Sequence, residues 1–187
     1  MCSNAIALFN TKYISGEIRF HQCNKTKGTL VIFNLSGMTP GKIRACHIHK
    51  YGDESNGCKS LGAHWNPSNT NHGYINLSIP YSNRYTHNIE SHAGDLLNNI
   101  KADKDGNFKF KYIDYRLNLR GNVNKSIFGR SVVIHNKVDD LGLGGDTESL
   151  NTGNAGRRIA CAIIGHCKWI LIIFLEVCLF SLVYVYH

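Results

Sequence analysis

Three histidines and a cysteine lie within a stretch of eighteen residues, a density that packing alone does not explain. They are His47, His49, Cys58 and His64. His47 and His49 are two residues apart, so on a β-strand both side chains would point to the same face. Imidazole is the commonest metal ligand among side chains, and convergent neutral imidazoles suit copper and zinc. This spacing therefore predicts a metal site.

Four further histidines follow that could join such a site. They are His72, His87, His92 and His135. A single scattered histidine is more often an ordinary surface or core residue. Residues 51–94, however, are rich in Gly, Asn and Ser and show little periodicity. Loops of this length are usually functional or disordered, and the histidines favour a loop that is organised around metal.

The elements that must position these side chains are predicted to be β-strands. Alternating apolar and polar residues, or β-branched runs, predict strands over 5–10, 16–21, 29–33, 47–49, 108–112, 131–135 and 159–164. Leu117 and Leu119 continue the alternation of the 108–112 strand. Residues 139–156 form a second glycine-rich loop. Short strands with turn signals and no helical periodicity predict an antiparallel sandwich or barrel.

Composition limits the class of protein. A chain of 187 residues with 43% hydrophobic residues is sufficient for one domain with a core. The net charge of +8 is dispersed, without the basic blocks typical of nucleic-acid binding, so we expect no nucleic-acid partner. Seven cysteines are an odd number, so at least one thiol is unpaired in a monomer. The first six residues lack the features of a signal peptide.

The C-terminal segment has a different composition. Residues 169–186 are apolar apart from Glu176 and Ser181. As a helix these residues would span roughly 27 Å, close to the hydrocarbon thickness of a bilayer. We expect a domain over 1–165, a linker over 166–168 and a transmembrane tail anchor, with the domain facing the cytosol. The alternative is an apolar appendage that packs against another protein, on a soluble cytosolic chain.

The histidine-rich region resembles the copper/zinc superoxide dismutase family. The segments that carry the resemblance are 47–53, 57–58, 62–67, 72–73, 92–96, 129–135, 139–142 and 153–161, in that order. It runs from about residue 4 to residue 165 and leaves the tail outside. The resemblance implies an eight-stranded antiparallel Greek-key barrel or sandwich with two long functional loops. It also implies a homodimer with one copper and one zinc per subunit, and a copper chaperone as a possible partner.

The resemblance also assigns roles to individual residues. It implies copper held by His47, His49, His64 and His135, and zinc held by His64, His72, His92 and Asp95, with His64 bridging the two metals. Asp139 matches the carboxylate that orients His47 and His72. Cys58 and Cys161 match an intrasubunit disulfide. Arg158 matches the arginine that guides the superoxide anion, while its neighbour Arg157 stands where a small neutral residue is expected.

The activity implied is dismutation of superoxide to oxygen and hydrogen peroxide, with copper alternately reduced and reoxidised and His64 taking up a proton. Some positions depart from the family. Nineteen residues separate His72 from His92, and His87 in this insert is an alternative zinc ligand, although only His92 is followed by Ala-Gly-Asp. Leu143 and Asn151 stand where steering lysines are common. The alternative function is a weakly active decoy that sequesters copper or a copper chaperone.

Overall fold

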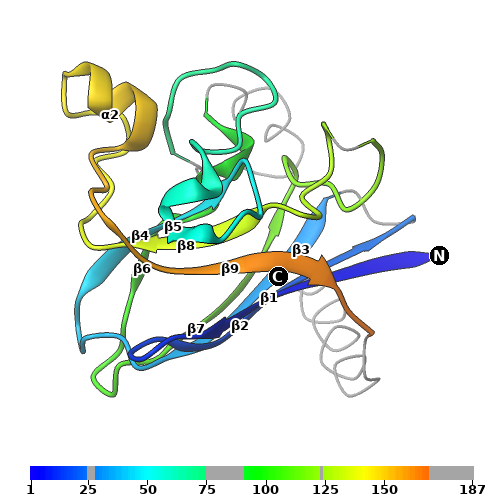
Figure 1. Cartoon of the computed structure of the whole chain (residues 1–187), viewed down its shortest axis with the longest axis horizontal. Helices are drawn as coiled ribbons and strands as arrows, with labels where there is room; N and C mark the ends of the chain where they lie inside the picture. Colours follow the sequence, from blue (N-terminus) through cyan, green and yellow to red (C-terminus); the bar gives the residue numbers. More distant parts are fainter. Residues whose placement is uncertain (25–27, 75–90, 123, 169–187) are drawn as a thin grey trace, which may run out of the picture.

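The computed structural model describes residues 1–24, 28–74, 91–122 and 124–168. Eight strands form one antiparallel sheet that curls into a nearly closed barrel (Figure 1). They are β1 (Cys2–Asn10), β2 (Ser15–Cys23), β3 (Thr29–Ser36), β4 (Ile43–His49), β6 (Asn98–Lys101), β7 (Phe108–Asp114), β8 (Ser131–His135) and β9 (Arg158–His166). Their order across the sheet is β6-β4-β8-β9-β1-β2-β3-β7. The predicted all-β antiparallel barrel is therefore confirmed.

Alternation along the strands builds the core. On β1, Ala5, Ala7 and Phe9 are buried while Leu8 between them is 62% exposed. This pattern follows from the two-residue period of a strand, which sends alternate side chains to opposite faces. The barrel interior is filled by large fully buried side chains, among them Phe9, Phe20, Phe33, Ile18 and Leu35. Each such side chain contributes roughly 1.5–3 kcal/mol to folding by leaving water.

Two long connections lie over β4 and β8 at one side of the barrel (Figure 1). The first joins β4 to β6, and its described part contains the short strand β5 (Ser55–Cys58) and two 3₁₀ turns, η1 (Lys59–Leu61) and η2 (Ala93–Asp95). The second joins β8 to β9 and contains the helix α2 (Thr147–Thr152). The two loops thus pack over the outer side of β4 and β8, whose backbone positions are fixed by the sheet.

The predicted continuation of the 108–112 strand through Leu117 and Leu119 is wrong. β7 ends at Asp114, whose carboxylate accepts a hydrogen bond from the Arg116 backbone N–H at 2.9 Å. This local turn takes the backbone out of the ladder. Leu117 and Leu119 are nevertheless 2% and 3% exposed, so their apolar character reflects core packing from a loop.

The sequence shows no helical periodicity before the predicted tail anchor, yet the second loop contains the short helix α2. Helix α2 spans six residues, which is too short for apolar periodicity to reveal it. Asp146 caps its N-terminus, with a side chain that accepts from the Ser149 backbone N–H at 2.8 Å, and Gly153 caps its C-terminus in a left-handed conformation with φ 64°. Local capping, rather than an amphipathic face, defines this helix.

The predicted tail anchor over 169–186 and the alternative zinc ligand His87 lie outside the described residues. Within the part of the chain that the structure describes, no helix has the length and apolar character needed to cross a membrane.

Candidate metal centre

Four buried histidines form the first cluster, and three of them come from barrel strands. They are His47 and His49 on β4, His135 on β8, and His64 from the loop after η1. His64 reaches the strand because the Trp65 backbone N–H donates to the carbonyl of Ile48 at 2.8 Å. The Nε2 atoms of His49 and His135 lie 3.2 Å apart. The candidate ligand atoms of all four lie within 4.8 Å of one another.

The second cluster is formed by His64, His72, His92 and Asp95, all of them buried and all from the long loop. The Nδ1 atoms of the three histidines converge on one carboxylate oxygen. They lie 3.2, 3.0 and 3.3 Å from Asp95 Oδ1. Because His64 belongs to both clusters, its two ring nitrogens face two different sites.

The carboxylate of Asp139 connects the two clusters, because it accepts hydrogen bonds from one histidine of each. Its Oδ2 accepts from His47 Nε2 at 2.7 Å, and its Oδ1 accepts from His72 Nε2 at 2.8 Å. Burial disfavours the ionised form, but these two hydrogen bonds outweigh it and hold the pKa of Asp139 well below its usual range. The carboxylate therefore places a ring proton of each histidine on Nε2, so that Nδ1 is the nitrogen that can bind a metal.

The donor atoms fit two metal ions. His47 Nδ1, His64 Nε2 and His92 Nδ1 are buried without a hydrogen-bond partner. A buried polar atom without a partner costs about 1–3 kcal/mol, and here the atoms point into the clusters. Burial lowers the pKa of His64 to about 3, so at neutral pH this ring carries the lone pair that a metal requires. Four nitrogens suit copper, and three nitrogens with one carboxylate suit zinc.

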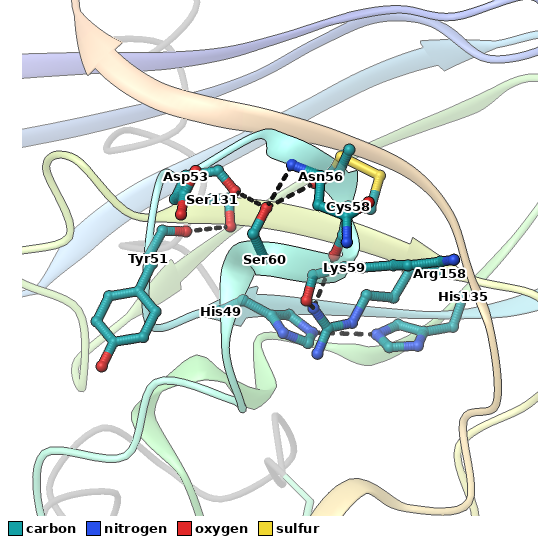
Figure 2. Close-up of a disulfide and its surroundings, with 12 residues drawn as sticks. His49, Tyr51, Asp53, Asn56, Cys58, Lys59, Ser60, Ser131, His135 and Arg158 are labelled. Atoms are coloured by element: carbon teal, nitrogen blue, oxygen red, sulfur yellow. Dashed lines mark hydrogen bonds between the residues drawn. A yellow bond between two sulfur atoms is a disulfide. The ribbon is translucent and has the colours of Figure 1, made fainter.

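Arg158 lies at the edge of the first cluster. Its guanidinium donates to the carbonyl of Cys58 at 2.7 Å and to that of Gly62. The same Gly62 carbonyl accepts from His49 Nδ1 at 2.8 Å, so one carbonyl orients both side chains. Figure 2 shows the guanidinium beside the rings of His49 and His135. Arg157, by contrast, is exposed.

Cys58 and Cys161 form a disulfide that joins the first loop to β9 (Figure 2). The bond holds the segment that presents its carbonyl groups to Arg158. Sequence reasoning missed a second disulfide, Cys2–Cys23, between β1 and β2. The sequence offered one signal, the spacing of two residues between His21 and Cys23, which places both side chains on one face of a strand. It could not identify Cys2 as the disulfide partner, because that depends on the register of β1 with β2.

Arg116 is another residue that sequence reasoning missed. It is half-buried beside the second cluster and donates to Ser91 Oγ at 2.8 Å, to the carbonyl of His92 at 3.1 Å and to that of Leu96 at 2.9 Å. Asp114 accepts from it at 2.8 Å and balances its charge. The guanidinium therefore fixes the backbone on both sides of η2. Nothing in the sequence spacing marks this role, because the two groups that it holds beside η2 are backbone carbonyls.

A family model described as copper/zinc superoxide dismutase (SODC) matches residues 14–164. The chain belongs to this family. The superoxide dismutase [Cu-Zn] of Paramecium bursaria Chlorella virus 1 is 42% identical over 83% of this chain and 74% of the relative. Superoxide dismutase [Cu-Zn] A of Xenopus laevis is 43% identical over 82% of this chain and 91% of the relative. The crystal structure of the clock protein EA4 matches with a TM-score of 0.76 and 35% identity, covering 88% of this chain and 95% of that chain.

Proposed function

We propose that this superoxide dismutase family member converts two superoxide anions and two protons into oxygen and hydrogen peroxide. Copper would be held by His47, His49, His64 and His135, and zinc by His64, His72, His92 and Asp95. The observation that carries the proposal is the shared histidine. His64 Nε2 is a buried nitrogen without a partner in the first cluster, and His64 Nδ1 faces Asp95 in the second. Copper, when bound, supplies one-electron chemistry by alternating between Cu(II) and Cu(I).

Arg158 binds and orients the anion in this mechanism. Burial lowers its pKa, but arginine remains charged at any physiological pH. The carbonyl groups of Cys58 and Gly62 hold the guanidinium beside His49 and His135. A fixed positive charge at this place attracts superoxide and aligns it with the copper ligands.

His64 holds and moves the proton. Its Nδ1 stays directed at the zinc side beside Asp95. Its Nε2 is the atom that would take up a proton when it is not engaged with copper, and would return it to the peroxide product. The remaining copper histidines are fixed by other acceptors: His49 by the Gly62 carbonyl and His135 by the Gly156 carbonyl at 3.1 Å. Their rings are thus held while His64 changes its protonation state.

The decoy hypothesis has no support in this site. A protein that binds metal without turnover would have no need for an oriented arginine or for a nitrogen shared between two clusters. Here both clusters are complete, and Arg158 is held by three hydrogen bonds to the backbone.

The test is superoxide dismutation by the copper- and zinc-loaded protein, compared with its Arg158→Ala and Arg157→Ala variants. We expect the rate constant to fall by about tenfold or more in Arg158→Ala, the lower end of the effect of electrostatic steering. Arg157→Ala is the matched control, with the same change in charge at the exposed neighbour, and should have the smaller effect. Equal effects would refute the guiding role of Arg158. Full metal loading without turnover in the unmodified protein would refute the enzyme and restore the decoy.

We also propose a homodimer and a membrane attachment for the chain. The homodimer is supported by exposed apolar side chains near Gly52. Ile163, which lies beside Gly52, is 42% exposed, and Tyr51, the residue before Gly52, is 49% exposed. Light scattering of Ile163→Glu against the unmodified protein tests it. The attachment is supported by the apolar composition of residues 169–186. Flotation of the chain with vesicles, with and without residues 169–187, tests the membrane attachment.

We propose a copper chaperone as a further partner. Copper transfer from a reduced metallochaperone to the metal-free chain tests this proposal.

A further inference from the structure

A third group of possible metal ligands lies away from the copper and zinc clusters, at the open end of the β1–β2 hairpin. Its members are Cys2, His21 and Cys23, whose candidate ligand atoms lie within 4.8 Å of one another. Cys2 pairs with Cys23 across the two strands, and Asn4 pairs with His21. Positions two apart on a strand share a face, so these two cross-strand pairs stand next to each other on one face of the sheet.

The hydrogen bonds of His21 fix which of its nitrogens carries the proton. Its Nδ1 lies 2.5 Å from Asn4 Oδ1, an oxygen that can only accept, so Nδ1 carries the hydrogen. Nε2 then has the lone pair, and it faces Cys23 Sγ at 3.0 Å. Burial lowers the pKa of His21, which favours the neutral ring. A ligating histidine whose other ring N–H donates to an oxygen is the usual arrangement at metal sites.

The two strands are held in register by more than the disulfide. Arg120 reaches across both of them, donating to the carbonyl of Met1 on one side and to that of Gln22 on the other. It also donates to the side chain of Asn24. The ladder of β1 with β2 continues for nine residue pairs, from Cys2–Cys23 to Asn10–Ser15. Cys2 and Cys23, with Cα atoms 4.1 Å apart, therefore stay adjacent when the disulfide is opened.

We propose that the reduced Cys2–Cys23 pair and His21 form a binding site for one Cu(I) ion, and that the disulfide is the closed form of this site. Two thiolates and one imidazole are soft and borderline ligands that select Cu(I), which is satisfied by three ligands. Zinc in a structural site requires four protein ligands, and the described residues of this cluster offer three. The positive charge of Arg120 beside the strand ends compensates the two thiolates.

The two forms exclude each other and interconvert by ordinary thiol chemistry. Two small-molecule thiols reduce the disulfide: their hydrogens pass to Cys2 and Cys23, and they leave as their own disulfide. Cu(I) then displaces the two thiol protons, which are released to solvent, and the metal keeps its oxidation state. Oxidation of the thiols by a disulfide of small thiols reverses the sequence and releases Cu(I). Cys2 is exposed and Cys23 half-buried, so both reductant and copper have access.

The experiment uses the full chain with its copper and zinc centres already loaded. After anaerobic treatment with dithiothreitol, Cu(I) is supplied from a chromophoric Cu(I) chelator, and uptake is measured with X-ray absorption at the copper edge. The proposed catalytic copper has nitrogen ligands alone, so copper–sulfur scattering reports the new site. We expect one further Cu(I) per chain with sulfur neighbours in the reduced protein, and none in the oxidised protein.

Variants separate this site from the other cysteines. Cys23→Ser should abolish both the extra Cu(I) and the copper–sulfur scattering, whereas Cys167→Ser, which removes a cysteine outside the cluster, should keep them. Asn4→Ala, which removes the acceptor for His21, should weaken Cu(I) binding by roughly tenfold to a hundredfold. Unchanged dismutation in each variant shows that the fold is intact. Absence of further uptake, uptake of Zn(II) in preference to Cu(I), or sulfur scattering that persists in Cys23→Ser would each overturn the proposal.

Discussion

Replacing Asp139 by asparagine tests the reasoning about proton placement most directly. The carboxylate accepts a ring N–H from His47 at one oxygen and from His72 at the other. Each oxygen also accepts a second donor, Asn98 Nδ2 at 3.0 Å on the first and the Leu141 backbone N–H at 2.7 Å on the second. An amide of the same shape has one accepting oxygen and one NH₂ group. In either orientation, the NH₂ group of Asp139→Asn faces two donors.

The expected loss of metal affinity follows from the number of donors that the new NH₂ group would face. One of the two imidazoles loses a hydrogen bond to a charged group, which contributes about 1.5–3 kcal/mol. The ring can recover a partner by moving its proton to Nδ1, but that blocks the metal-binding nitrogen. At 1.4 kcal/mol for each factor of ten, either the copper or the zinc affinity should fall by about tenfold to a hundredfold. Competition with chelators of known affinity, one metal at a time, measures both.

The matched control is Asp140→Asn, which makes the same change at the next residue. The Asp140 carboxylate accepts from Ser149 Oγ and from Asn154 Nδ2, both at 2.8 Å, and among the described residues it has no hydrogen bond to a member of either cluster. It should leave both affinities within about threefold, less than the range for groups that orient metal ligands. If Asp139→Asn binds copper and zinc as tightly as the control, the carboxylate does not set the ring protons and the reasoning is refuted.

Further predictions concern protonation, stability and ligand identity. Burial lowers the pKa of His72, but hydrogen bonds to two carboxylates outweigh it and raise the pKa to about 9; zinc binding near pH 7 should therefore release about one proton, falling to none above pH 9. Calorimetry in buffers of different ionisation enthalpy measures this, and a release that does not vary with pH would contradict it. Replacing Cys58 and Cys161 by serine, which opens a disulfide spanning 103 residues, should lower the free energy of unfolding by about 4.7 kcal/mol in denaturant titrations; a loss below about 1 kcal/mol would show that the metal loop is held by other contacts. His92→Ala should lower zinc affinity by more than about a hundredfold, beyond the effect of an orienting group, while His87→Ala leaves it unchanged; the reverse result would exchange the two assignments.

The parts of the site that sequence reasoning could predict are those set by local geometry. The two-residue spacing of His47 and His49 is sufficient to place both on one face of a strand, and the structure buries both in the first cluster. His64 needed more, because its position depends on a loop that returns to β4 through the backbone of Trp65. Only the resemblance to a known family supplied that link.

The parts that could not be predicted depend on register and on backbone acceptors. Cys2 and Cys23 meet because β1 and β2 pair over nine positions, and a shift of one residue would send the two thiols to opposite faces. Arg116 acts on the carbonyls of His92 and Leu96, groups that every residue possesses and no side-chain pattern marks. Such contacts become visible only once the chain is folded.

The two metal clusters differ in where their ligands originate, and this difference has a physical consequence. His47, His49 and His135 are on barrel strands whose positions are fixed by the ladders of β4, β8 and β9. The members of the second cluster all come from the long loop, where Asp139 links His72 to His47 on β4 and Arg116 holds the backbone on both sides of η2. Metal bound at preformed strand ligands adds little to folding, whereas metal bound by loop ligands carries the free energy of ordering that loop. We therefore expect zinc to be the metal that orders this loop, and to act through His64, which belongs to both clusters.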